Sequence, residues 1–312
     1  KKGEAKGMKN QQSNAIYPAL EEFSSELSSE LSSETALTHR EASEYVRAAT
    51  SNNTRRAYQS DIQQFLKRGG QLPSTPAQLV SYLRSVAKEY NPRSLSRQVI
   101  VLKQWHKLKK HPDPTQDPEV IRTLRGITRL HGQPKIQSQA MRLEDLDKVI
   151  AKLGQNESLL AKRNLALILL GFFGAFRRSE LAAIQWEDIH FERDGLIVRL
   201  KRSKTDQTGE GSRAVIPVGG EDPRSPILAL IEWRRASGCY SGPVFRQLTK
   251  STKGTKATKA AKVREEGICA RQINRIVREV AKEAGLPNPE RYSSHSLRRG
   301  FATEASRLGD SM

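Results

Sequence analysis

The sequence predicts a mainly α-helical protein with a small antiparallel β-sheet, built from a helical N-terminal domain and a mixed α+β C-terminal domain. In the first half of the chain, apolar residues recur every three or four positions in segments separated by proline and glycine. This spacing is typical of short helices. Further along, two short segments alternate apolar and polar residues on either side of a loop that contains Gly209 and Gly211. That pattern is typical of a β-hairpin.

The 312 residues suffice for two domains of ordinary size. Residues 133–140 lack apolar periodicity and contain Pro134, so we interpret them as a linker. The linker separates a helical core domain at residues 41–132 from a second domain at residues 141–312. Residues 1–40 precede both domains and are rich in serine, which predicts poor order, with a marginal helix as the alternative.

The predicted elements follow from apolar periodicity and from capping residues or prolines at the first turns of helices. The core-domain helices begin at Asn53, Pro76, Pro92 and Pro118. In the second domain we predict helices over residues 143–153, 159–174, 179–185, 225–236 and 270–284, and a last helix that includes 295–303. Strands are predicted at residues 196–200, 214–218 and 244–245.

The outer face of the helix that begins at Pro92 carries Arg93, Arg97 and Gln104. On a helix these three side chains lie within about 40° of one another, opposite the apolar stripe. Arginine and glutamine make bidentate contacts with guanine and adenine edges in the major groove of DNA. We therefore expect this face to contact DNA, with a solvated polar face as the alternative.

The charge balance favours a polyanionic partner. Lysine and arginine outnumber aspartate and glutamate by 53 to 34, which gives a net charge of +19. Nucleic acid is the commonest partner of such a chain. A membrane is disfavoured, because the most apolar run, Leu165–Phe176, covers twelve residues and a span needs about 20. Cys239 and Cys269 form neither a metal-ligand spacing nor a disulfide framework, so we expect a cytoplasmic protein.

Five lysines recur at every third position in a segment of threonine, glycine and alanine. On an α-helix this step would spread them over about two thirds of the cylinder, so they would not share one face. We interpret the segment as a basic loop that contacts DNA phosphates, with a plain solvated loop as the alternative. The five are Lys250, Lys253, Lys256, Lys259 and Lys262.

Three separated clusters contain the side chains that phosphoryl transfer requires. Two arginines, Arg177 and Arg298, can clamp the non-bridging oxygens of a phosphodiester through forked hydrogen bonds. Lys204 can protonate the leaving 5′ oxygen, and His295 can hydrogen-bond the phosphate and help move the nucleophile's proton. Glu180 can orient Arg177 from three positions away, although an ordinary surface ion pair is the alternative for these two.

These clusters, in this order, resemble the tyrosine recombinase (phage integrase) family, the Cre- and Xer-like enzymes of DNA strand exchange. The family's first arginine lies in an Arg-x-(Ser/Ala)-Glu-(Leu/Ile) motif after a buried helix, as Arg177 does here. Its lysine lies in a β-hairpin, matched by Lys204, and its His-x-x-Arg box is matched by His295 and Arg298. The neighbouring Arg178 and Arg299 are the alternatives for the two arginines. The resemblance covers about residues 45 to 308.

The resemblance implies a two-domain, C-shaped clamp around double-stranded DNA. It also implies that DNA strands are cut and rejoined through a 3′-phosphotyrosine, by a homotetramer on two DNA sites and without metal, ATP or another cofactor. No distinct acidic cluster of the kind that a metal-dependent nuclease needs accompanies these motifs.

The family pattern continues to a nucleophilic tyrosine some tens of residues beyond the His-x-x-Arg box. Here no tyrosine follows Arg298, and Tyr292 lies on the wrong side of the box. We therefore expect the nucleophile beyond Met312, in a longer protein. The alternative is a non-catalytic DNA-binding protein that retains the clamp.

Overall fold

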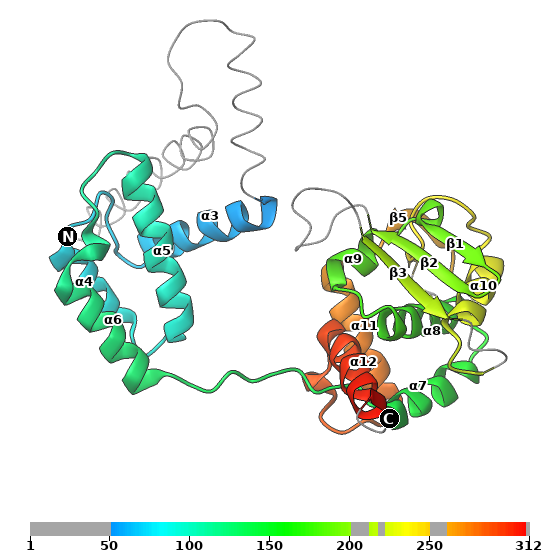
Figure 1. The fold of residues 1–312 in the computed structure, drawn as a ribbon. Helices are drawn as coiled ribbons and strands as arrows, with labels where there is room; N and C mark the ends of the chain where they lie inside the picture. Colours follow the sequence, from blue (N-terminus) through cyan, green and yellow to red (C-terminus); the bar gives the residue numbers. More distant parts are fainter. Residues whose placement is uncertain (1–50, 201–211, 218–221, 250–260, 310–312) are drawn as a thin grey trace, which may run out of the picture. The chain divides into compact units, whose positions relative to one another are not determined.

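The computed structural model describes residues 51–200, 212–217, 222–249 and 261–309, and Figure 1 shows its ribbon. Its backbone contacts define two compact units, and the boundary between them in the sequence lies between Lys135 and Ile136. Several predictions concern residues outside the described ones: the N-terminal extension at 1–40, and Lys204, Lys250, Lys253, Lys256 and Lys259.

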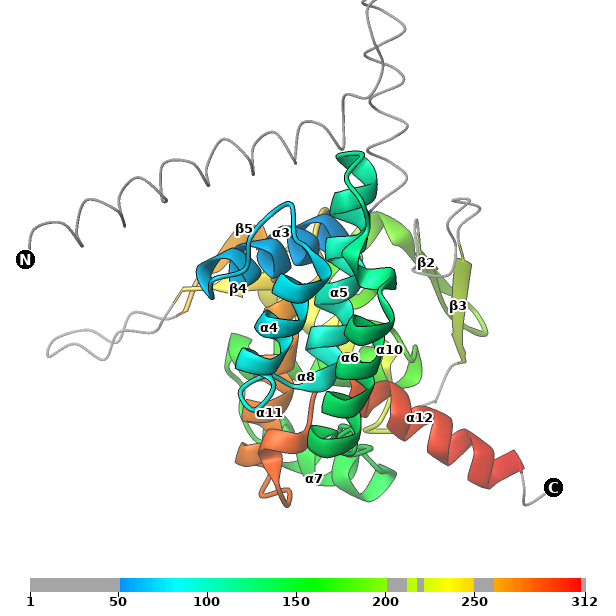
Figure 2. The ribbon, with the colours of Figure 1, turned by 90° about the vertical axis from the view of Figure 1, so that its left-hand side faces the viewer.

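The first unit is helical, as predicted. Helices α4, α5 and α6 pack together and α3 lies against α5 (Figure 2). Proline stands at the first turn of α4, α5 and α6, where its missing N–H costs no helical hydrogen bond. The N-cap of α3 is Ser51, two residues before the predicted start. The helices are α3 (Asn52–Lys67), α4 (Pro76–Val86), α5 (Pro92–Leu108) and α6 (Pro118–His131), with a 3₁₀ turn η1 (Pro114–Gln116).

The second unit combines helices with two small antiparallel sheets. Its helices are α7 (Leu143–Gly154), α8 (Leu159–Phe173), α9 (Arg178–Ala183), α10 (Pro226–Ser237), α11 (Ala270–Glu283) and α12 (Ser294–Gly309). Its strands are β1 (Ile189–Glu192), β2 (Gly195–Leu200), β3 (Ser212–Pro217), β4 (Arg246–Leu248) and β5 (Val263–Gly267). Two 3₁₀ turns, η2 (Trp186–Asp188) and η3 (Pro289–Arg291), complete it. The predicted fold class, mainly helical with a small antiparallel sheet, is confirmed.

The predicted hairpin is formed by β2 and β3, which pair antiparallel, and β1 adds a third strand beside β2. Leu196 and Ile216 face each other in the core, whereas Val215 is exposed, as the alternating pattern requires. The predicted strand at residues 244–245 is wrong. Val244 and Phe245 are buried, but they lie in irregular structure just before β4. The Val244 N–H donates to the Ile184 carbonyl, and the Phe245 carbonyl accepts from the Ile268 N–H.

Helix α8 forms the centre of the second unit, where α7, α10 and α12 contact it (Figure 1). All residues from Ala166 to Phe172 are buried, so α8 is apolar on every side. Across from it, Trp233 of α10 is fully buried and donates from Nε1 to the Val244 carbonyl at 2.8 Å. Among the described residues, no helix combines the length and the apolar character that crossing a membrane requires.

The C-terminal end of the predicted linker is attached to the second unit. The Gln139 N–H donates to the Arg291 carbonyl at 3.0 Å, and the hydroxyls of Ser138 and Ser293 lie 2.9 Å apart. The Met141 N–H then donates to the Ser296 carbonyl at 3.0 Å. These bonds fix the segment just before α7 against the start of α12.

Candidate active site

Arg177 is the N-cap residue of α9, and Glu180 in the first turn holds it at two points. The Arg177 backbone N–H donates to Glu180 Oε2 at 2.8 Å, and Arg177 Nη1 donates to Oε1 at 2.8 Å. The first bond is the reciprocal half of a capping box. The Glu180 side chain is 5% exposed and that of Arg177 is 27% exposed. The predicted pairing is therefore observed, with the carboxylate buried and the guanidinium partly open to solvent.

Arg298, the second predicted arginine, contacts the turn between α8 and α9, which ends at Arg177. Arg298 of α12 donates from Nη1 to the carbonyl oxygen of Ala175 at 2.8 Å. Ala175 has φ of +47°, a left-handed conformation that is uncommon for a residue with a Cβ atom. Such backbone strain is frequent where a chain must present a particular group. Here it presents the carbonyl that receives Arg298, two residues before Arg177.

Two glycines allow α12 to approach its neighbours closely enough for this contact. A Cβ atom added to Gly171 of α8 would lie 2.8 Å from Leu297 Cδ1 and 3.0 Å from Leu181 Cδ2. Leu297 and Leu181 thus pack over the bare backbone of α8. A Cβ atom added to Gly300 would overlap the carbonyl oxygen of Met141. Both glycines therefore set the position of the helix that carries His295 and Arg298.

His295 lies exposed in the first turn of α12, and its backbone N–H donates to Ser293 Oγ at 3.2 Å. The same turn is fixed by Ser294, whose hydroxyl and N–H both donate to Asn274 Oδ1 of α11. Three positions separate His295 from Arg298, so both lie on one side of the helix. Lys204, the fourth predicted group, falls between β2 and β3 in the sequence.

The surroundings of the alternative arginines, Arg178 and Arg299, differ from those of Arg177 and Arg298. Arg299 donates from Nη1 to the Ser138 carbonyl, at the end of the predicted linker, rather than to the α8–α9 turn. Arg178 is exposed at the first position of α9. Arg298, and not Arg299, therefore contacts the turn that precedes Arg177.

Tyr292 is fully buried and has a structural role. Its hydroxyl donates to Asp145 Oδ2 at 3.2 Å and accepts from Gln139 Nε2 at 3.0 Å. Burial, together with the charge of Asp145, raises the pKa of Tyr292 to about 12. A hydroxyl that is harder to ionise and enclosed in the core is unsuited to attack a DNA phosphate, in agreement with the sequence analysis.

The predicted DNA-contact residues of α5 differ in their partners. Arg93 and Gln104 are exposed. Arg97 is also exposed, but its guanidinium forms two hydrogen bonds with Asp61 of α3, a residue that the sequence analysis missed. Lys262 is exposed beside β5, where its backbone pairs with Thr249.

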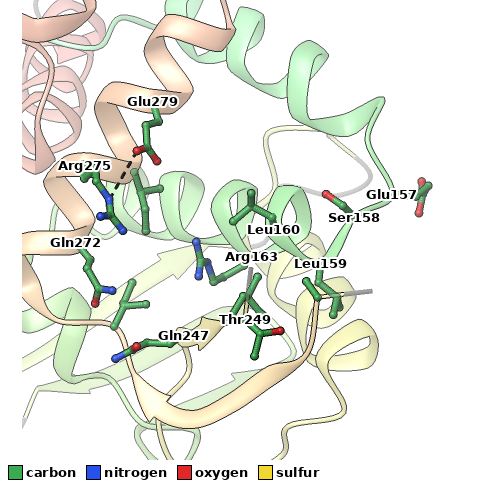
Figure 3. Close-up of a pocket in the computed structure, with 14 residues that line it drawn as sticks. Glu157, Ser158, Leu159, Leu160, Arg163, Gln247, Thr249, Gln272, Arg275 and Glu279 are labelled. Carbon is green, nitrogen blue, oxygen red and sulfur yellow. Dashed lines mark ion pairs between the residues drawn. The ribbon is translucent and has the colours of Figure 1, made fainter. Parts of the chain in front are cut away.

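A pocket of about 810 Å³ lies elsewhere in the second unit, between the start of α8, the β4–β5 pair and α11 (Figure 3). Arg163 projects into it toward Arg275 and Gln272, and none of the predicted catalytic residues is among its lining. Burial lowers the pKa of the Arg163 guanidinium to about 10. Its nitrogens donate to Asn164 Oδ1 and to the Arg246 carbonyl. The candidate active site is therefore the surface around Arg177 and Arg298 and not this pocket.

Within the part of the chain that the structure describes, no three His, Cys, Asp or Glu side chains gather in a way that could hold a metal ion. The sequence profile of the phage integrase family matches residues 139–310. The chain belongs to this family. The predicted resemblance is thereby confirmed, and the matched residues include the whole candidate active site.

Curated relatives extend the match into the first unit. An integrase/recombinase xerD homolog from Selenomonas ruminantium is 31% identical over 272 residues, which make up 85% of this chain and 76% of that protein. Tyrosine recombinase XerA from Pyrococcus furiosus is 25% identical over 257 residues, 81% of this chain and 74% of that one.

Solved structures of phage integrase family members share the fold. Lambda integrase (residues 75–356) bound to DNA has a TM-score of 0.57 at 14% identity, covering 94% of this chain and 87% of that one. XerH site-specific recombinase bound to a palindromic difH substrate has a TM-score of 0.55 at 15% identity, covering 88% and 75%. At these identities the likeness concerns the fold alone.

Proposed function

We propose that this member of the phage integrase family is a site-specific DNA recombinase that cuts and rejoins strands through a 3′-phosphotyrosine. The observation that carries the proposal is the hydrogen bond from Arg298 to the Ala175 carbonyl, which brings Arg298 to the turn that precedes Arg177. In this proposal the two guanidiniums together would clamp the two non-bridging oxygens of a phosphodiester.

Each residue of the candidate site has a distinct role in this proposal. Arg177 and Arg298 bind the phosphate and stabilise the charge that develops on its oxygens. Glu180 is a positioning residue, because it holds Arg177 through both of its oxygens. His295 hydrogen-bonds the phosphate, and Lys204 gives a proton to the 5′ oxygen as the phosphorus–oxygen bond to it breaks.

The nucleophile in this proposal is a tyrosine that follows Met312 in the full-length protein. Its hydroxyl loses its proton with the help of His295 as its oxygen bonds to phosphorus, and the bond from phosphorus to the 5′ oxygen breaks as Lys204 protonates that oxygen. A 5′ hydroxyl of another strand later attacks phosphorus and displaces the tyrosine oxygen, which regains a proton. The two units would close as a C-shaped clamp on double-stranded DNA, and four copies would act together on two sites. Support comes from the order of the motifs and from the family to which the chain belongs.

The direct test is covalent trapping. With its natural downstream residues added, the protein is expected to form a protein–DNA adduct on a duplex that loses its 5′ fragment after cleavage, without added divalent metal. The adduct should carry the DNA 3′ phosphate on a tyrosine, which peptide mass spectrometry identifies. Specific DNA binding without any adduct would instead support the alternative, a non-catalytic DNA-binding protein. A requirement for magnesium would contradict the proposed chemistry.

The lysines between Lys250 and Lys262 are expected to contribute sequence-independent affinity. Changing all five to glutamine should weaken binding to every duplex alike, because phosphate contacts carry no sequence information. The slope of log K against log salt should become flatter by about 0.9 for each lost contact. Changing the same five residues to arginine keeps their charge and is the matched control, which should preserve the slope. An unchanged slope in the glutamine variant would show that the segment is merely solvated.

A further inference from the structure

The pair formed by Asp61 and Arg97 joins a buried carboxylate to an exposed guanidinium. Arg97 Nε donates to Asp61 Oδ2 and Arg97 Nη2 donates to Oδ1, both at 2.7 Å. The Asp61 side chain is only 4% exposed, whereas that of Arg97 is 55% exposed. The carboxylate is thus fixed within the first unit, and the arginine extends from it on the outer side of α5.

Two further buried side chains keep Asp61 in place. Gln98 Nε2 donates to the Asp61 carbonyl at 2.9 Å, and the Tyr82 hydroxyl donates to Gln98 Oε1 at 2.8 Å. All three residues are buried, so this network ties α3, α4 and α5 together beneath Arg97. Since a buried hydrogen-bond network resists rearrangement, the direction in which Arg97 points is set before any ligand arrives.

The bonds to Asp61 occupy one edge of the Arg97 guanidinium and leave the other edge available to a ligand. A guanidinium has five N–H donors in a planar fork, and Asp61 takes the donors on the Nε and Nη2 side. The remaining edge, formed by Nη1 and the second hydrogen of Nη2, has the geometry that bonds O6 and N7 of guanine. Because Asp61 offsets most of the positive charge, the pair attracts a phosphate weakly but keeps its directional donors.

We propose that Asp61 is a positioning residue that presents Arg97 for the recognition of guanine in the major groove, and this rests on the DNA-binding function proposed above. Arg97 would read one base pair, and Asp61 would set its specificity without touching DNA. Holding the side chain in its binding geometry removes conformational freedom that would otherwise be lost on binding. Arg93 and Gln104, exposed on the same helix, are placed to contact neighbouring positions.

The test is selection from a pool of randomised duplexes, followed by sequencing of the bound fraction. The unmodified chain should select guanine at the position that Arg97 reads. Asp61→Asn and Arg97→Lys should both lose this preference, by about ten-fold in relative affinity and at the same base pair. Affinity of Asp61→Asn for unrelated DNA should stay within about two-fold, because no phosphate contact is removed.

The matched control is the pair of Arg84 and Glu119, which lies on the surface of the same unit with N and O 3.6 Å apart. Glu119→Gln should leave base preference unchanged. Retained preference in folded Asp61→Asn, or equal loss of affinity for all sequences in Arg97→Lys, would overturn the proposal. If thermal unfolding shows that Asp61→Asn is not folded, Asp61→Glu is the second variant, because it keeps the charge but displaces the carboxylate that holds Arg97. Unchanged base preference in that variant would overturn the proposal. Failure of the unmodified chain to bind any duplex would instead contradict the proposed DNA-binding function.

Discussion

Replacing either Arg177 or Arg298 with alanine is expected to abolish covalent trapping in the protein that carries its natural downstream residues. In the proposed mechanism, each change removes a cation that stabilises charge developing on the phosphate oxygens in the transition state. Loss of one such donor typically slows an enzyme by about 100-fold to 1,000-fold. DNA affinity should change by no more than a few-fold, since each arginine supplies one phosphate contact among many. Adduct yield on gels and DNA binding at equilibrium measure the two effects.

The neighbouring Arg178 offers a matched control, because it is exposed at the first position of α9. Arg178→Ala should retain most of the trapped adduct. Loss of trapping in Arg178→Ala with retention in Arg177→Ala would show that the sequence motif has been assigned one position too early. A large, equal loss of DNA affinity in all three variants would indicate a binding role rather than a catalytic one.

Gly300→Ala is expected to destabilise the second unit strongly. The added Cβ atom would overlap the Met141 carbonyl oxygen, so the backbone of α12 or of the segment at Met141 must shift. Overpacking of this kind costs about 3 kcal/mol. For a unit of this size the midpoint of thermal unfolding should fall by roughly 6–12 °C. Circular dichroism during heating measures the change.

Gly154→Ala is the matched control in the same unit. Gly154 closes α7, and nothing lies within 4 Å of the position that its Cβ atom would occupy. This variant should be neutral or stabilised by up to about 1 kcal/mol, since alanine loses less backbone entropy than glycine in a helix. A Gly300→Ala protein as stable as the Gly154→Ala protein would show that α12 is free to shift away from Met141.

The elements that were predicted well are those in which local sequence determines structure. Prolines at the first turns of α4, α5 and α6 marked these helices, because proline fits there and not in a helix interior. Alternation of apolar and polar residues likewise marked β2 and β3. Strand β5 was missed because Val263 is the one apolar residue in its sequence VREEG. Its strand conformation comes from pairing with β4, which no local pattern reveals.

The candidate site likewise combines features that local sequence predicts with features that only long-range packing determines. Local motifs were enough to nominate Arg177, Glu180 and Arg298, and the pairing of the first two follows from their spacing. The contact of Arg298 with Ala175 joins residues 123 positions apart and depends on a left-handed turn. Asp61 was missed for a similar reason, because its partner is 36 positions away. In isolation, an aspartate on a helix is ordinary, and only packing makes it a buried charge that needs a partner.

The attachment of Ser138 and Gln139 beside α12 has a mechanical consequence. Tension applied to the chain between the two units reaches the second unit at these residues, whose bonds go to Ser293 and to the Arg291 carbonyl. Both partners lie within four residues of His295. A pull on the connecting segment therefore reaches the turn that opens α12, and through Gln139 it also reaches the buried hydroxyl of Tyr292. The connecting segment is thus tied to the helix that carries His295 and Arg298.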